Sequence, residues 1–194
     1  MAVLGITGGI GSGKSTFSRI LARLLPAEIF DADATARRLL ETDSGVREAV
    51  RRDVSPLAYT PDGSADRNAI RRVVFENPGA RARLEAILHP LVRSRWLQFA
   101  AESRAANTHV IVDIPLLFET NAESFFDRIL TVACSRENQM ARIAARGLAR
   151  DQIEKIIESQ LPLDQKIARS DFVVWNDGTL AILEDQAAEL DLNS

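Results

Sequence analysis

The sequence predicts an α/β fold in which a five-stranded parallel sheet is flanked by helices, with an inserted helical subdomain and a helical lid. A short apolar segment near the N-terminus runs into a glycine cluster and then into a helical pattern. Further short apolar segments follow, and helix-forming sequence separates them. Consecutive parallel strands need such crossovers, and strands that are buried on both faces read as continuous apolar runs.

The strand candidates are short apolar runs that are bounded by polar or helix-forming residues. They are residues 2–7, 28–30, 110–113, 129–134 and 172–175. The gap from residue 31 to residue 109 has an almost wholly helical pattern and is longer than one crossover requires. This excess indicates an inserted helical subdomain.

Apolar residues at helical spacing predict the helices. The segments are 15–25, 65–75, 81–88 and 179–190. Pro26 ends the first of them, because proline cannot continue a helix. A further long helix is expected to begin at Pro90, since proline is favoured at the first helical position.

We expect one domain, residues 1–194, because the chain has the length of a single compact unit. Within it, residues 1–31, 107–134 and 171–194 form the predicted core. Residues 32–106 form the helical subdomain, and residues 135–170, which are helical and rich in arginine, form the lid.

Composition narrows the possible functions. A net charge of −3 argues against a broad nucleic-acid surface, and no apolar run is long enough to cross a bilayer. The N-terminus lacks a secretory leader, and Cys134 is the single cysteine, so we expect a cytoplasmic protein. Cys134 sits in an apolar run and is interpreted as a buried hydrophobic residue.

Residues 8–15 match the pattern G-x-x-x-x-G-K-[ST] between a predicted strand and a predicted helix. The glycines, Gly11 and Gly13 among them, let successive N–H groups point at phosphates, and Ser12 lies between them. The helix that follows adds its positive end. The pattern predicts a phosphate-binding loop.

Three side chains at the end of this loop have expected roles. Lys14 is expected to bind the β and γ phosphates, Ser15 to ligate Mg²⁺, and Thr16 to contact the α-phosphate. The chain has 21 arginines and only three lysines, so a lysine is an unusual choice in this chain and its location at position 14 is informative. The base-reading N-K-x-D of GTPases is absent, which favours ATP as the phosphoryl donor.

Aspartates follow two of the predicted strands. Asp33 could face the ligand crevice of an α/β sheet and accept the proton of an attacking hydroxyl, or Asp31 or Asp33 could cap the next helix. Asp113 could hold a magnesium-bound water, or it could be a turn residue at a strand end. Spacing alone leaves both alternatives open.

In the predicted lid, Gln139, Arg142 and Arg146 recur on one helix, with the arginines four residues apart and so on one face. Such arginines could neutralise charge that develops on a transferred phosphoryl group. The alternative is a solvated helix face, and from spacing alone it is the favoured interpretation.

The whole pattern resembles the dephospho-coenzyme A kinase family. The matching stretches are, in order, LGITGGIGSGKST (4–16), DADATAR (31–37), Asp62-Gly63, Asp66-Arg67, Val74-Phe75, Leu88-His89-Pro90, DIPLLFE (113–119), Gln139 with Arg142 and Arg146, Gln160, and DFVVWNDG (171–178). Their joint order distinguishes this family from other small-molecule P-loop kinases. One departure is that Gly147 follows Arg146 directly, where the family often has an acidic residue between them.

The resemblance implies a P-loop kinase core, and a kinase that uses ATP to phosphorylate the ribose 3′-hydroxyl of dephospho-coenzyme A, the last step of coenzyme A biosynthesis. It implies Asp33 as the base near the acceptor ribose, Arg37 and Arg67 near the acceptor, and Asn176 near the donor adenine. His89 is a weaker candidate for acceptor binding, because His89-Pro90 also reads as a structural helix start, the interpretation favoured here.

Two rival functions remain open. One is a nucleoside monophosphate kinase or another small-molecule kinase on the same core, although the large helical insertion favours a bulkier acceptor. The other is a nucleotide-operated switch that hydrolyses ATP slowly. Such a switch would bind a macromolecule, and the net negative charge of the chain argues against nucleic acid as that macromolecule.

Overall fold

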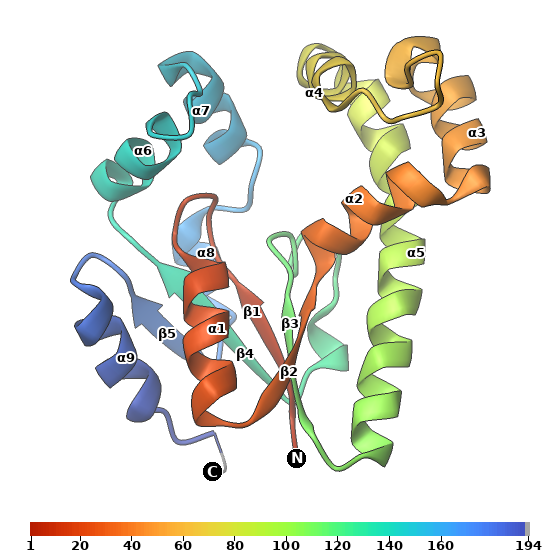
Figure 1. Ribbon diagram of the computed structural model, residues 1–194. Coiled ribbons are helices and arrows are strands. Elements are labelled where there is room, and N and C mark those ends of the chain that lie inside the picture. The colour runs from red at the N-terminus through yellow and green to blue at the C-terminus, as the bar shows by residue number, and fades with distance from the viewer. Residues whose placement is uncertain (193–194) are drawn as a thin grey trace. The chain divides into compact units, whose positions relative to one another are not determined.

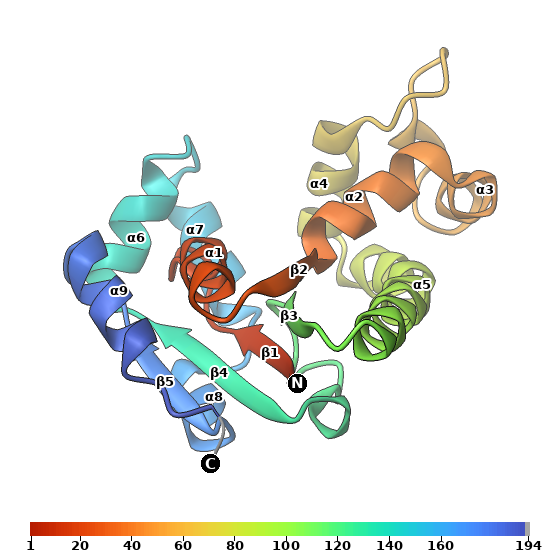
Figure 2. The ribbon, with the colours of Figure 1, turned by 60° about the horizontal axis from the view of Figure 1, so that its bottom comes forward.

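The structure is a computed structural model that describes residues 1–192, so the last two residues of the predicted core range 171–194 lie outside the described residues. The chain divides into two compact units, Met1–Asp31 with Phe99–Ser194 and Ala32–Gln98. Figures 1 and 2 show the elements of each unit. The first unit contains the sheet and the phosphate loop, and we describe it first.

A five-stranded, all-parallel sheet is the centre of the first unit, which confirms the predicted fold class. Its order is β2-β3-β1-β4-β5. The strands are β1 (Val3–Thr7), β2 (Ala27–Asp31), β3 (His109–Asp113), β4 (Arg128–Ala133) and β5 (Phe172–Trp175). Because β1 lies between β3 and β4, the loop that follows it opens at the middle of the sheet's carboxyl edge.

Helices cover both faces of this sheet (Figure 2). On one face, α1 (Lys14–Leu24) packs beside α9 (Leu180–Ala188), and on the other α8 (Leu163–Ala168) packs on β4. Phe17, Leu21 and Leu183 are buried with the strand residues Leu4 and Leu130 in one apolar cluster. This cluster holds α1, and with it the phosphate loop, against the sheet.

The remaining elements of the first unit are short. Helices α6 (Arg136–Ala144) and α7 (Arg150–Glu158) stand over the carboxyl edge of the sheet (Figure 1), and η2 (Glu123–Phe125) precedes β4. Gly147 ends the turn after α6 with a φ of +83°, a left-handed conformation that glycine adopts without strain. The predicted lid range 135–170 therefore holds two helices over the loop and a third, α8, that packs on the sheet.

The second unit is a helical cluster. It contains α2 (Ala32–Thr42), α3 (Ser44–Asp53), η1 (Pro56–Ala58), α4 (Arg67–Glu76) and most of α5 (Pro78–Ala105). Its own core includes Leu39, Val50, Tyr59, Ile70 and Leu88. The predicted boundary at residue 106 falls later than the boundary of this compact unit at Gln98, because α5 runs without a break from one unit into the other.

The prediction of a helix beginning at Pro90 is wrong. Pro90 lies inside α5, which is continuous from Pro78 to Ala105. The proline removes its own backbone hydrogen bond and crowds the preceding turn of the helix, but the side chains of Leu88 and Trp96 on either side are buried and held by packing. Tertiary packing outweighs the local preference of proline here.

Candidate active site

The phosphate loop, residues 8–15, is built on glycines whose side-chain positions are filled by other atoms. Gly8, Gly11 and Gly13 have φ values of +143°, +76° and +95°. A Cβ at Gly8 would lie 2.2 Å from the Val132 carbonyl oxygen, and one at Gly13 would lie 2.1 Å from the Asn176 amide nitrogen. The curvature and packing of the loop thus both require glycine at these positions.

Lys14 is the first residue of α1 and its side chain is buried over the loop. Its Nζ donates to the carbonyl oxygens of Gly8, at 3.1 Å, and Gly9, at 3.0 Å. The Ser12 hydroxyl is also buried, and its Oγ has no hydrogen-bond partner. The loop therefore combines a cation, a buried polar atom and a helix N-terminus, which is a fitting site for the phosphates of a nucleotide.

Ser15 and Asp113 meet beside the loop. The Ser15 hydroxyl donates to Asp113 Oδ2 at 3.0 Å, which joins the first turn of α1 to the end of β3. Asp113 is buried and lies at the carboxyl end of its strand. Both side chains offer oxygen, the ligand type that Mg²⁺ prefers.

The sheet register adds Asp31 to this edge, a residue that the sequence analysis considered only as a helix cap. Asp31 ends β2 and is the register partner of Asp113 on β3. Register partners on neighbouring strands point to the same face of a sheet, so these two carboxylates share a face. The sequence showed an aspartate at each strand end, but the register that pairs them comes from the fold.

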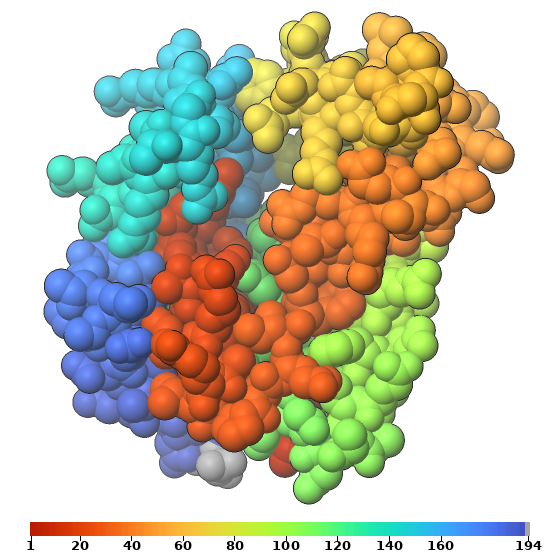
Figure 3. Space-filling model, viewed as in Figure 1, coloured from red at the N-terminus to blue at the C-terminus, as the bar shows by residue number. Residues whose placement is uncertain are grey.

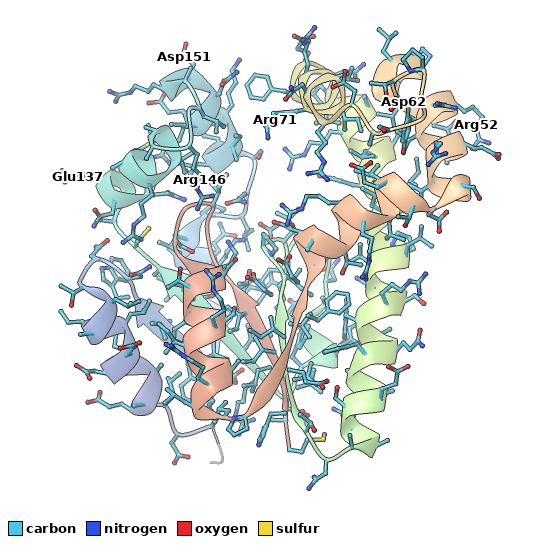
Figure 4. All side chains as sticks on the ribbon, in the orientation of Figure 1. Arg52, Asp62, Arg71, Glu137, Arg146 and Asp151 are labelled. Carbon is cyan, nitrogen blue, oxygen red and sulfur yellow. The ribbon has the colours of Figure 1, made fainter. Side chains whose placement is uncertain are left out.

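The predicted lid arginines have different environments. Arg142 Nη2 donates to the Asn176 carbonyl oxygen at 2.7 Å, and its Nη1 donates to the Ser12 carbonyl oxygen at 3.4 Å. Arg146 is exposed. Figure 4 places Arg146 between the lid helices and the phosphate loop, whereas Glu137 and Asp151 are on the outer side of the lid.

Asn176 follows β5 directly and is buried. Its side-chain amide donates to the Ser12 carbonyl oxygen at 2.7 Å. Together with Arg142 it makes the Ser12 carbonyl a shared acceptor for a lid residue and a sheet residue. Asn176 and Arg142 are thereby brought together at the back of the loop, which spacing in the sequence could not show.

Asp177 anchors the start of the lid to the end of β5. It accepts hydrogen bonds from the Ser135 backbone N–H and hydroxyl, from Asn138 Nδ2 and from Trp175 Nε1. These donors, with the Asn138 amide first and the Ser135 backbone next, lower the pKa of Asp177 from 3.8 to about 2. The first turn of α6 is therefore fastened to the sheet through an ionised carboxylate.

Comparison with known proteins agrees with this geometry. The family model described as dephospho-CoA kinase matches residues 2–181. The chain belongs to the dephospho-CoA kinase family. Two dephospho-CoA kinases, from Symbiobacterium thermophilum and Anaeromyxobacter dehalogenans, are 41% and 40% identical over 93% and 98% of this chain, and 76% and 90% of their own lengths.

Solved structures agree with the membership. A Thermus thermophilus protein, TT1252, superposes with a TM-score of 0.76 at 37% identity, over 94% of this chain and 92% of its own. A dephospho-CoA kinase from Campylobacter jejuni superposes with a TM-score of 0.70 at 26% identity, over 95% and 92%. A shikimate kinase from Acinetobacter baumannii, with a TM-score of 0.55 and 14% identity over 96% and 89%, shares the fold alone.

The residues that the resemblance to dephospho-CoA kinases assigns to the acceptor all lie in the second unit. Asp33 and Arg37 are exposed on α2, which begins directly after β2. Arg67 is the first residue of α4, and its Nη2 donates to Glu41 Oε1 at 3.1 Å. His89 is half-buried inside α5, where burial lowers the pKa of its imidazole.

Among residues 1–192, no helix is both long enough and apolar enough to span a membrane. Within the same range, no group of three or more histidine, cysteine and acidic side chains could hold a metal ion. The second finding is compatible with a magnesium site of the kind kinases use, because Mg²⁺ is usually held by one or two side chains together with substrate phosphates and water.

Proposed function

We propose that this chain transfers the γ-phosphoryl group of ATP to the 3′-hydroxyl of the ribose of dephospho-coenzyme A, giving coenzyme A and ADP. Membership of the dephospho-CoA kinase family supports the reaction. The structural observation that carries the proposal is the contact of Ser15 with Asp113 at 3.0 Å beside the Lys14 loop. This contact places two side chains with oxygen atoms suited to Mg²⁺ beside the phosphate-binding loop, within one unit.

On the donor side, the loop N–H groups and the positive end of α1 would hold the phosphates. Lys14 would exchange its contacts with the Gly8 and Gly9 carbonyls for the β and γ phosphate oxygens. Thr16, two residues into α1, would contact the α-phosphate. Gly11, Ser12 and Gly13 would form the floor of the site.

Ser15 and Asp113 would hold Mg²⁺, Ser15 directly and Asp113 through bound water. When bound, the ion neutralises charge on the β and γ phosphates. The two side chains already share a hydrogen bond, so their oxygens converge on one place. Asp31, on the same face of the sheet, would add a second carboxylate charge that favours a cation at this place.

On the acceptor side, Asp33 would orient the ribose hydroxyl and take its proton as the new oxygen–phosphorus bond forms. The bond from the γ phosphorus to the bridging oxygen breaks, and ADP leaves with that oxygen. Arg37 and Arg67 would bind charged groups of the acceptor. The Glu41 carboxylate holds Arg67 in place at 3.1 Å and so would set its orientation.

Arg142 and Arg146 would act from the lid. Arg142 donates to the Ser12 and Asn176 carbonyl oxygens, and these contacts support a role for its guanidinium on the donor side, where Asn176 is proposed to lie near the adenine. Arg146 would neutralise charge on the phosphoryl group in the transition state of its transfer. His89 remains a secondary candidate for acceptor binding. We place the enzyme in a reducing cytoplasm, in keeping with the buried, free thiol of Cys134.

The test is an acceptor panel. The protein is incubated with Mg-ATP and dephospho-coenzyme A, nucleoside monophosphates or no acceptor, and ADP formation is followed while the phosphorylated product is identified by mass spectrometry. ADP formation with dephospho-coenzyme A alone supports the proposal. Turnover with monophosphates would select another small-molecule kinase, and ADP formation without acceptor would select an ATP-driven switch.

The metal is tested in the same assay. Removal of Mg²⁺ by a chelator is expected to abolish transfer, and added Mg²⁺ to restore it. Transfer that persists without divalent cations would contradict the assignment of Ser15 and Asp113 as metal-binding residues.

A further inference from the structure

Ile10 lies at the tip of the phosphate loop, and side chains of the lid segment hold both of its backbone polar groups. Its N–H donates to Gln160 Oε1 at 3.0 Å. Its carbonyl oxygen accepts from Gln139 Nε2 at 2.7 Å. Gln139 lies on α6, and Gln160 follows the end of α7, so two parts of the lid segment converge on one residue. Figure 3 shows the lid helices adjoining the loop.

These two contacts orient the peptides on either side of Ile10. A trans peptide is planar, and its C=O and N–H point in opposite directions. Because Gln160 holds the Ile10 N–H, the Gly9 carbonyl points the other way, where it accepts from Lys14 Nζ at 3.0 Å. Because Gln139 holds the Ile10 carbonyl, the Gly11 N–H points away from Gln139.

The loop needs such support because glycine permits peptide rotation. Gly9 and Gly11 flank Ile10, and Gly11 has a φ of +76°. A glycine-rich segment visits many backbone conformations at similar energy, so each peptide could turn over unless a neighbour holds it. A Cβ at Gly9 would lie only 2.6 Å from Gln139 Nε2, so the approach of the glutamine itself depends on glycine.

A small cavity of about 50 Å³ lies where the phosphate loop meets the lid segment. Gly9, Ser12, Gln139 and Gln160 are among the residues that line it. This volume is enough for a few water molecules at most and is too small for a nucleotide. The loop and the lid segment therefore adjoin at this cavity and are joined there by the two glutamine contacts.

We propose that Gln139 and Gln160 are positioning residues that hold the peptides before and after Ile10 in the orientation that binds nucleotide. The proposal rests on the proposed role of the loop as the ATP site. It directs the Gly9 carbonyl, one of the two carbonyls that Lys14 contacts, toward Lys14 and presents the Gly11 N–H on the opposite side from Gln139. It also couples the placement of the lid helices to the conformation of the loop.

The test uses Gln139→Met and Gln160→Met, which keep side-chain length but remove both polar groups. Gln165→Met is the matched control, because Gln165 is an exposed residue of α8 in the same segment. Each variant is measured for amide exchange at Ile10 by NMR, for affinity toward a nonhydrolysable ATP analogue by calorimetry, for kinetic constants and for melting temperature.

Analogue affinity is expected to fall about 3- to 10-fold in each methionine variant, the usual effect of losing one neutral hydrogen bond. The KM for ATP should rise in parallel. Exchange of the Ile10 amide should accelerate in Gln160→Met, while Gln160→Glu, which keeps an acceptor oxygen, should restore its protection. The double variant should lose less than the product of the single losses, because both side chains hold one residue. Gln165→Met should change none of these.

Analogue affinity within twofold of the parent in both methionine variants would overturn the proposal. So would equal losses in Gln165→Met, or a drop in melting temperature with unchanged KM, since these indicate a general effect on the fold. Unchanged Ile10 exchange in Gln160→Met would show that the contact is absent. Analogue binding requires no acceptor, so the result stands whether or not the protein phosphorylates dephospho-coenzyme A.

Discussion

Lys166 Nζ lies 2.8 Å from Glu119 Oε1, and the lysine side chain has an exposed fraction of 0%. The same ammonium donates to the Pro115 carbonyl oxygen at 2.9 Å, and Glu119 Oε1 also accepts from the Leu161 N–H at 2.8 Å. These contacts join Lys166 of α8 and the backbone of Leu161 just before it to the turn after β3, the strand that ends in Asp113.

Lys166→Met is expected to destabilise the fold by about 3 kcal/mol or more, because it leaves the Glu119 carboxylate largely buried without its cation. Urea unfolding measures this loss. The double variant Lys166→Met with Glu119→Gln should regain part of it, since the unpaired charge is gone. Arg150→Met is the control, as Arg150 is 81% exposed in its pair with Glu154 and should change stability by about 1 kcal/mol at most. Similar losses in both single variants would contradict this account.

Asp177→Asn tests the anchor between β5 and the lid. The pKa of Asp177 is lowered from 3.8 to about 2 in the folded chain, so its ionised form is favoured by folding. The stability it supplies is complete above about pH 4 and is lost as pH falls through about 2. The difference in unfolding free energy between parent and variant should be constant from pH 7 to pH 5 and should shrink below pH 4. A difference that does not change with pH would show that the charge is not involved.

Arg142→Ala and Arg146→Ala should affect different kinetic constants. Arg142 holds the Ser12 and Asn176 carbonyls, so its loss should raise the KM for ATP. Arg146 is exposed toward the loop side of the lid, and its loss should lower kcat by up to ~10³-fold. Arg136→Ala, at the exposed start of α6, is the control and should be close to the parent. Normal turnover in the Arg146 variant would favour the solvated-face interpretation.

Asp33→Asn should leave binding of a nonhydrolysable ATP analogue nearly unchanged and lower kcat by ~10²- to 10⁴-fold, the range for a positioned general base. Single-turnover transfer measures the chemical step directly. Asp31→Asn is the matched variant, because Asp31 shares a sheet face with Asp113 and should instead raise the Mg²⁺ concentration needed for half-maximal rate. If Asp33→Asn raises the Mg²⁺ requirement and leaves transfer by the bound fraction normal, Asp33 serves the metal.

Local patterns in the sequence predicted much of the fold. Each of the five strands lies within two residues of the range predicted for it, and α1 and α9 occupy the predicted segments. Pro90 shows where local rules fail, because burial of Leu88 and Trp96 keeps α5 helical across it. The second unit and the placement of α8 likewise depend on which apolar faces find partners.

The sequence by itself determined the phosphate loop, since glycines at fixed spacing before Lys14 and Ser15 have few other physical uses, and it also determined the family. Only the tertiary structure decided that Asp31 pairs with Asp113, that Arg142 and Asn176 share the Ser12 carbonyl, and that Gln139 and Gln160 meet at Ile10. The physical reason is that strand register and helix placement are set by burial of the whole core. Contacts between residues more than 80 positions apart follow from that burial and leave no local spacing in the chain.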